Sequence, residues 1–240
     1  MSAGSRGTRR LALAAAVGVL LSGCSIFGPT PTPHTPCPTQ APSGSQVTSL
    51  LADASDAVVQ TSRGSFTISL YGDKAPIATA NFVALARCGF YDGITFHRVV
   101  AGYLIQTGDP QTKKNQGVFD GLGSGGPGYA FAIENPAPDL TYDKYVVAMA
   151  NALRRDTAGN IVGGENSNGS QFFIDLIDLP SGFPRDYTIF GKVTDGTSVI
   201  DAIGQVPTNG TPETGPQNVP LDPVVIQSIT VRGKAGPSSG

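Results

Sequence analysis

The sequence predicts a mainly β protein, built as a closed or nearly closed antiparallel barrel with two helices. Three observations lead to this fold class. The segments with strand-like patterns are short, turns rich in glycine and proline separate them, and only two segments place apolar residues at helical spacing. A layered α/β sheet needs a helix after nearly every strand, whereas a barrel covers its own core and removes its exposed edges. One folded domain is therefore expected within the 240 residues.

The N-terminus has the pattern of an export signal. Three arginines precede residue 11, an apolar run follows from Leu11 to Leu21, and small residues lead to Cys24. The run is too short for a membrane-spanning helix, which needs about 20 apolar residues. Its end resembles the bacterial lipoprotein signal, in which cleavage before the cysteine leaves a lipid-modified thiol. We expect a signal peptide over 1–23 and lipidation, including palmitate, at Cys24; a plain secretory peptide is the alternative.

Two segments outside the expected domain at 56–233 have compositions unlike a folded core. From Gly28 to Gln46 the chain is rich in proline, threonine, serine and glycine, so it lacks the apolar surface that would offset its ordering entropy. We expect an extended tether over 24–55, which would lift the domain off a membrane surface. Residues 234–240 are small and polar, and we expect a flexible tail there.

Cys37 and Cys88 remain if Cys24 carries a lipid. An exported protein matures in an oxidising compartment, where a disulfide could join the tether to the domain. Two free thiols, with Cys88 acting as a small buried apolar residue, are an equal alternative. The sequence does not show whether the two α-carbons come within bonding distance, so both possibilities stay open.

Hydrophobic periodicity places the elements of the domain in order. Segments 57–61 and 66–71, the second of which alternates apolar and polar residues, predict a hairpin. A helix is expected to begin at Pro76 and to stop at Gly89, because helices tolerate proline in the first turn and glycine after the last. A second helix is expected at Ser198–Ile203. Further short strands are expected at Thr95–Val100, Leu104–Gln106, Tyr145–Met149, Gln171–Asp175, Thr188–Val193 and Val224–Val231.

Two polar clusters within apolar strands supply the candidate functional residues. One apolar run contains Arg98 and Gln106, and burying either side chain without a partner costs several kcal/mol. Further along, Asn151 and Gln171 lie at the ends of apolar strands, where their amides could bind a peptide backbone. Phe173 would offer an apolar wall beside them. The alternative for the two amides is that they cap turns.

Several classes of function lack support in the sequence. The formal net charge is −2 and no basic face with aromatic residues is indicated, so no nucleic-acid partner is expected. The two histidines, His34 and His97, are too few for the convergent ligands of a zinc site, and His97 is interpreted as a structural residue. The glycine-rich segment 121–128 lacks the Gly-Lys-Ser/Thr ending of a phosphate loop and is interpreted as a surface loop. We expect no metal and no cofactor.

Five short motifs follow one another along the domain. They are Phe96-His97-Arg98, Gln106-Thr107-Gly108-Asp109, Met149-Ala150-Asn151, Asn168-Gly169-Ser170-Gln171-Phe172-Phe173 and Phe190-Gly191-Lys192-Val193. In this order they resemble the cyclophilin-type peptidyl-prolyl cis-trans isomerases, over roughly residues 57–232. The resemblance implies an eight-stranded antiparallel closed β-barrel capped by two α-helices. It also implies isomerisation of X–Pro bonds without a cofactor or metal.

The resemblance implies roles for individual residues. Arg98 matches the catalytic arginine. The residues that match or lie near the substrate-binding set are Tyr103, Leu104, Gln106, Ala150, Asn151, Gln171, Phe173, Phe183 and Tyr187. The rim differs from the usual pattern, because Tyr103 replaces a phenylalanine and Tyr187 replaces a common histidine. The segment Ala152–Glu165 is longer than the usual family loop and is expected to border the groove, where it would affect which residues are accepted beside proline.

Together these features predict an isomerase that acts on X–Pro bonds of exported or cell-envelope proteins and so assists their folding. Arg98 would stabilise the twisted amide of the substrate. We expect a monomer, held by its lipid anchor at the extracytoplasmic face of the cell membrane, with proline-containing polypeptides as substrates. The alternative is a membrane-tethered peptide-binding module or holdase that keeps the groove but has little turnover.

Overall fold

The computed structural model describes residues 1–2, 35–209 and 218–233. Cys24, the tail 234–240 and nearly all of the expected signal peptide lie outside these residues, so lipidation and export stay predictions. Within the described ranges no helix is long and apolar enough to cross a membrane.

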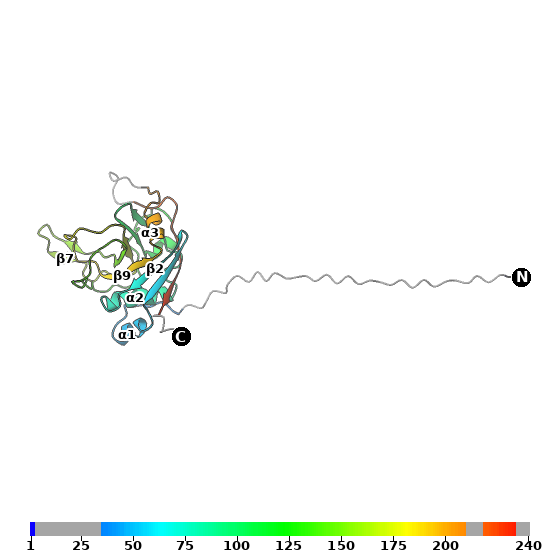
Figure 1. The fold of residues 1–240 in the computed structure, drawn as a ribbon, viewed down its shortest axis with the longest axis horizontal. Helices are drawn as coiled ribbons and strands as arrows, with labels where there is room; N and C mark the ends of the chain where they lie inside the picture. Colours follow the sequence, from blue (N-terminus) through cyan, green and yellow to red (C-terminus); the bar gives the residue numbers. More distant parts are fainter. Residues whose placement is uncertain (3–34, 210–217, 234–240) are drawn as a thin grey trace, which may run out of the picture. The chain divides into compact units, whose positions relative to one another are not determined.

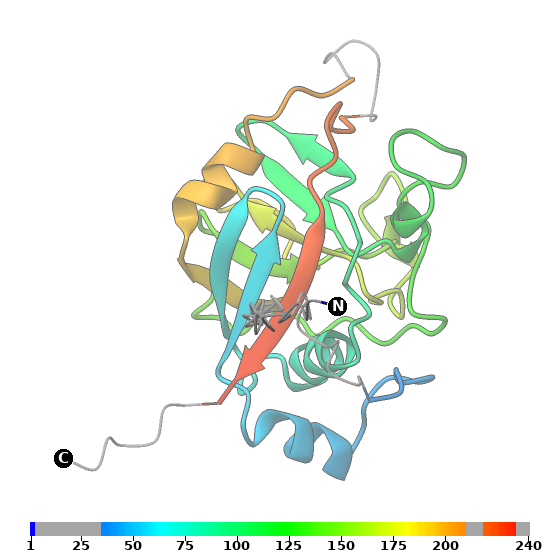
Figure 2. The same cartoon turned by 90° about the vertical axis from the view of Figure 1, so that its right-hand side faces the viewer.

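In the part of the chain that the structure describes, eight strands form one antiparallel sheet. Figures 1 and 2 show how the sheet curves between the helices. Their order across the sheet is β10-β1-β2-β9-β5-β8-β4-β3. The mainly β fold, the first hairpin and each of the further short strands are confirmed. The strand bounds are β1 Asp56–Thr61, β2 Gly64–Leu70, β3 Arg98–Val100, β4 Leu104–Thr107, β5 Val146–Met149, β8 Phe172–Asp175, β9 Ile189–Asp195 and β10 Ile226–Arg232.

The sheet curls but stays open, so the predicted closed barrel is not confirmed. Its edge strands, β10 and β3, form no ladder with each other. The two edges meet only around an isolated bridge between Thr95 and Val225. There the Phe96 N–H donates to the Val224 carbonyl at 2.9 Å, and Ile226 exchanges hydrogen bonds of 2.8 Å with Ile94 and Gly93. Pro223 precedes this contact, and a proline has no N–H with which to extend a ladder. Closure therefore stops after a few residues.

Helix α2 (Pro76–Arg87) is the helix expected from the apolar spacing after Pro76. The proline lies in the first turn, where its missing N–H costs no hydrogen bond. The Glu134 carboxylate accepts from the backbone N–H groups of Ile77 and Ala78 at 3.0 and 2.8 Å, and so caps the helix from a distant loop. Gly89, with φ of 71°, follows the last turn in the left-handed region.

The apolar core lies on the inner face of the curled sheet, against α2 and α3 (Thr197–Ile203). Helix α3 confirms the second predicted helix. The Phe82 ring of α2 meets the Phe172 ring of β8 edge-on at 5.7 Å, which ties the helix to the middle of the sheet. The largest fully buried side chains of the described residues are Tyr91, Phe66, Phe82, Phe96, Phe172, Phe190, Ile68, Leu85, Ile94, Ile105, Met149 and Ile174.

A third helix, α1 (Ser45–Leu51), lies within the range 24–55, so the described part of that range is not the extended tether that the composition predicts. Cys37 and Cys88 form a disulfide with α-carbons 5.1 Å apart, which settles the alternative that the sequence left open. Leu50 packs against the main core, and α1 lies beside α2 in both views (Figures 1 and 2). The composition of this N-terminal segment did not predict its structure, because one disulfide and a few apolar side chains are enough to hold it against the domain.

The long segment Ala152–Glu165 forms a small hairpin of its own, which the sequence analysis did not predict. Strand β6 (Arg154–Arg155) pairs with β7 (Ile161–Gly163) as a separate two-stranded sheet. The Asp156 carboxylate accepts from backbone N–H groups inside the turn and so closes it. The hairpin lies at the periphery of the fold, where β7 is labelled in Figure 1.

Candidate active site

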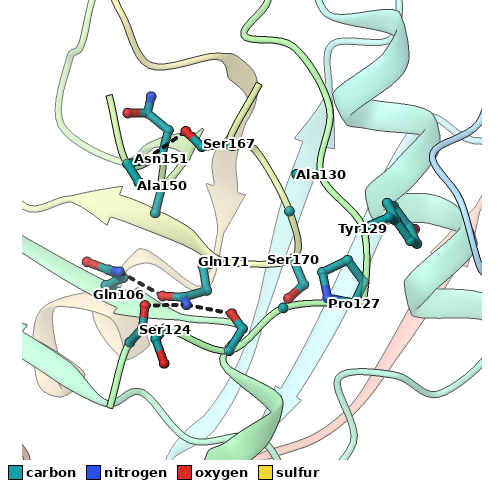
Figure 3. A pocket seen from close by; sticks show the side chains of 15 residues that line it. Gln106, Ser124, Pro127, Tyr129, Ala130, Ala150, Asn151, Ser167, Ser170 and Gln171 are labelled. Atoms are coloured by element: carbon teal, nitrogen blue, oxygen red, sulfur yellow. Dashed lines mark hydrogen bonds between the residues drawn. The ribbon is translucent and has the colours of Figure 1, made fainter. Parts of the chain in front are cut away.

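Three polar side chains form a chain of hydrogen bonds across neighbouring strands. Arg98 on β3 pairs in register with Gln106 on β4, and its Nη1 donates to Gln106 Oε1 in a long contact of 3.4 Å. Gln106 Nε2 donates to Gln171 Oε1 at 3.0 Å. Gln171 Nε2 then donates to the carbonyls of Gly123 and Gly125 at 2.7 and 2.8 Å (Figure 3). The sequence-predicted Arg98, Gln106 and Gln171 thus lie together and orient one another.

An apolar patch adjoins this polar chain on the outer face of the sheet. Side chains alternate across a strand, so Leu104 and Gln106 share the outer face while Ile105 points into the core. We call this patch the outer apolar cluster. Its members are the buried Leu104, Tyr142, Val146, Ala148, Phe173 and Ile189 with the half-buried Tyr71, Tyr103, Leu140, Ala150, Leu179, Phe183 and Tyr187. Six of the predicted substrate-binding residues therefore lie in one cluster.

Aromatic contacts define one wall of the outer apolar cluster. The Tyr187 ring meets the Phe173 ring edge-on with centroids 5.3 Å apart, and it stacks on the Phe183 ring at 5.6 Å. Phe183 in turn meets Tyr142 edge-on at 5.0 Å. Each ring rests on another, so the wall is fixed by its own packing. Such a surface can hold an apolar ring beside the Arg98 guanidinium.

A cavity of about 390 Å³ lies beside Gln106 and Gln171, at the end of the polar chain away from Arg98. Ala150 belongs to both this cavity and the outer apolar cluster, and Gln106 joins the cavity to Arg98 through its hydrogen bond. Arg98 and Phe173 do not line the cavity, so the predicted residues divide between two adjoining regions. The cavity is lined by Gln106, Gly123, Ser124, Gly125, Gly126, Pro127, Tyr129, Ala130, Ala150, Asn151, Ala152, Ser167, Gly169, Ser170 and Gln171 (Figure 3).

The glycine-rich segment 121–128, interpreted from sequence as a plain surface loop, supplies one wall of this cavity. The fully buried Asp109 holds it, because its Oδ2 accepts from the N–H groups of Gly123 and Gly125 at 2.7 and 3.4 Å. A β-carbon at Gly125 would overlap Asp109 Oδ1. The signal for this arrangement was present in the sequence, since an acid at the end of a buried strand needs donors and closely spaced glycines can bring backbone N–H groups to it.

Asn151 contributes differently from the prediction. Its side-chain Nδ2 donates to the Asp186 carbonyl at 2.8 Å, and its Oδ1 accepts from the Leu153 N–H at 3.1 Å. The amide points away from Gln106 in Figure 3 and joins two loops. These two contacts are those of the turn-capping alternative, while Asn151 also lines the cavity beside Ala150.

Two buried titratable side chains lie close to the site without belonging to its polar chain. Burial lowers the pKa of His97 to about 4, and neither ring nitrogen has a hydrogen-bond partner among the described residues. The ring is therefore neutral at pH 7, as expected of a structural residue. Burial, with the Asp143 charge as a second cause, raises the pKa of Asp175 to about 8. No group of three or more potential metal ligands is found in the described ranges.

Comparison with known proteins places this architecture in a family. The chain matches the family model described as cyclophilin type peptidyl-prolyl cis-trans isomerase/CLD over residues 57–231. Relatives include a probable peptidyl-prolyl cis-trans isomerase A of Mycobacterium leprae, which is 40% identical over 203 residues, covering 77% of this chain and 96% of the relative. Peptidyl-prolyl cis-trans isomerase A of Mycobacterium tuberculosis is 42% identical over 193 residues, covering 73% of this chain and 91% of the relative.

Solved structures agree with the sequence relatives. The crystal structure of a cyclophilin type isomerase of Cryptosporidium parvum matches with a TM-score of 0.61 and 30% identity, covering 76% of this chain and 99% of the other. A second structure of that isomerase, in the presence of the dipeptide Ala-Pro, matches with a TM-score of 0.58. The protein belongs to the cyclophilin-type peptidyl-prolyl cis-trans isomerases. It is an enzyme of that class, and proline-containing peptides are its substrates.

Proposed function

We propose that catalysis takes place where Arg98 meets the outer apolar cluster, and that Arg98 donates to the prolyl nitrogen of a twisted X–Pro amide. One observation supports this most: Arg98 contacts Gln106, and Gln106 pairs in register with Phe173, whose ring packs against Tyr187. The wall would hold the pyrrolidine ring. The cavity beside Gln171 would take a residue of the substrate that precedes the proline.

The chemistry explains why an arginine suits this place. Amide resonance sets a rotation barrier of about 18–20 kcal/mol, while trans exceeds cis at X–Pro by only about 0.5–1 kcal/mol. Twisting the bond returns a lone pair to the prolyl nitrogen, and a donor there stabilises the twisted state more than either planar state. Arg98 is always charged and directional, and its contact with Gln106 restrains it before substrate arrives.

Replacing Arg98 by alanine tests this assignment. Loss of one donor to a transition state costs about 100-fold or more in rate, so we expect kcat/KM for a proline peptide to fall by at least that factor. Arg63→Ala is the matched control, because Arg63 is a surface arginine paired with Asp222. A wild-type rate in the Arg98 variant would refute the assigned role. No acceleration by the wild-type protein would instead favour a holdase that binds without turnover.

We further propose that the enzyme is exported and anchored by a lipid on Cys24, so that it acts on cell-envelope proteins. The signal-like N-terminus supports this, and so does the Cys37–Cys88 disulfide, because disulfides persist in oxidising compartments. In the native host, the wild type is expected in the membrane fraction. The Cys24→Ser variant is expected in the soluble fraction or with its signal peptide uncleaved. Mass spectrometry of the extracted protein is expected to show an acylated Cys24. A soluble mature wild type without the lipid would exclude the anchor.

A further inference from the structure

The hairpin β6–β7 is connected to the wall of the site through one ion pair. Arg155 on β6 donates from Nε and Nη2 to Asp186 Oδ2 at 3.1 and 2.6 Å. Its third nitrogen, Nη1, donates to the Gly159 carbonyl in the turn of the same hairpin at 2.6 Å. The Asp186 side chain is only 19% exposed and that of Arg155 38%, so the contact is better shielded than a pair on open surface.

Asp186 is also held through its backbone. Its carbonyl accepts from the Asn151 side-chain amide at 2.8 Å, and the same amide group fixes Leu153 at the start of the hairpin segment. The main chain of Asp186 is therefore bound by Asn151, before the hairpin, and its side chain by Arg155, on the first strand of the hairpin. This double attachment restricts the residue that follows in the chain, which is Tyr187.

Tyr187 is the residue of the aromatic wall that this attachment reaches. Its N–H donates to Tyr142 Oη at 3.1 Å, and the Tyr142 hydroxyl donates to the Tyr187 carbonyl at 2.8 Å. Its ring closes on Phe173 at 5.3 Å and on Phe183 at 5.6 Å. The Arg155 contact thus acts on the backbone directly before a ring that faces the proposed proline site.

We propose that Arg155 and Asp186 are a positioning pair, which holds Tyr187 against Phe173 and so sets the affinity of the groove for the X–Pro segment. This inference rests on the proposed function, because it takes the outer apolar cluster as the proline site. Neither residue of the pair touches the reacting amide. The apolar wall contacts the ring equally in the planar and twisted states, so the pair contributes uniform binding, which appears in KM and not in kcat.

Alanine at Arg155 is the first test, with alanine at Arg154 as the matched control. Arg154 is the neighbouring arginine on β6, is exposed and has no ion pair among the described residues. Freeing one side chain to move raises the cost of binding, so Arg155→Ala is expected to raise KM about 3- to 10-fold while kcat stays within about twofold. Arg154→Ala is expected to leave both parameters and the urea midpoint at wild-type values.

A reciprocal exchange separates a positioning role from general damage to the hairpin. Asp186→Asn keeps the carbonyl that Asn151 reaches and is expected to reproduce the higher KM. Arg155→Glu combined with Asp186→Arg restores an ion pair of opposite direction, and we expect KM to return toward the wild-type value, with Arg155→Lys intermediate. Recovery in the exchanged variant cannot come from a hairpin that has simply unfolded.

The results distinguish this proposal from the assignment of the site itself. An unchanged KM in Arg155→Ala, or a fall in kcat at constant KM, would overturn the positioning pair even if Arg98→Ala is inactive. A higher KM in Arg154→Ala of the same size would also overturn it, because the effect would then be one of charge alone. If Arg98→Ala keeps full activity while the Arg155 variants behave as described, the proposed catalytic group fails and the positioning pair stands.

Discussion

At the scale of single residues, the ionised carboxylate of Asp175 on β8 destabilises the folded state. It is fully buried, and neither carboxylate oxygen has a hydrogen-bond partner among the described residues. Burial first, and the Asp143 charge second, raise its pKa from 3.8 to about 8. The folded protein therefore binds a proton that the unfolded chain releases above pH 4. The free energy of unfolding is therefore highest, as far as Asp175 is concerned, below about pH 4, and it falls as the pH rises to about 8.

Asp175→Asn is accordingly expected to flatten the dependence of stability on pH. The variant keeps the shape of the protonated acid, so its free energy of unfolding should approach that of the wild type near pH 4. Near pH 8 it should exceed the wild type by about 2–4 kcal/mol, taking 1.36 kcal/mol per pKa unit and allowing for relaxation of the site. Urea unfolding at several pH values measures this, with the exposed Asp195→Asn as control. Parallel pH profiles for wild type and Asp175→Asn would contradict it.

Single residues also show what sequence reasoning captures at the site. Arg98, Gln106 and Phe173 could be found because strand alternation assigns each to one face, and an arginine in an apolar run demands an explanation. The sequence shows the acid and the glycines of the contact between Asp109 and Gly123 but does not pair them, because the contact spans a loop whose path depends on the whole fold. For Asn151 the sequence left two roles open, because an amide suits a turn as well as a ligand; the structure shows its turn contacts, and its substrate-binding role stays a prediction.

At the scale of elements, the N-terminal arm is fastened by a crosslink that closes a long loop. Cys37 and Cys88 are 51 positions apart, and in the chain-entropy treatment a loop of that length is stabilised by about 4 kcal/mol. Helix α1 has no fully buried residue and packs against the core through the half-buried Leu50. Its order should therefore depend on the disulfide.

Replacing both cysteines by serine is expected to lower the free energy of unfolding by about 2–4 kcal/mol. Amide exchange should accelerate in Ser45–Leu51 while the strands keep their protection, because the arm packs against the core only through partly buried side chains and supplies none of its buried members. Hydrogen exchange followed by mass spectrometry, beside urea unfolding of the oxidised wild type, measures both effects. Unchanged exchange in α1 would show that packing alone holds the helix.

Two short elements of the fold could not be predicted from hydrophobic patterns. The strands and α2 followed from periodicity and from the turn residues that bound them. Helix α1 and the hairpin β6–β7 were missed because both are short and carry little apolar periodicity. The Glu134 cap on α2 comes from 57 positions away from Ile77, so no local pattern contains it. The open edge between β3 and β10 depends on where a proline interrupts the pairing.

At the scale of the whole molecule, the disulfide shortens the distance over which a lipid anchor could act. The chain from Cys24 to Cys37 spans 13 steps, or at most about 45 Å when fully extended. The longer tether expected over 24–55 would have allowed more than twice that reach. If Cys24 carries a lipid as proposed, the catalytic domain stays close to the membrane surface, where exported chains emerge.

The central claim is that Arg98 acts on the twisted amide and not on substrate binding. NMR exchange measurements on a proline peptide give the dissociation constant and the cis–trans rate of the bound peptide separately. For Arg98→Ala we predict a dissociation constant within about threefold of the wild type and a bound-state rate at least about 100-fold lower. A bound-state rate equal to that of the wild type, with affinity alone reduced, would contradict the account.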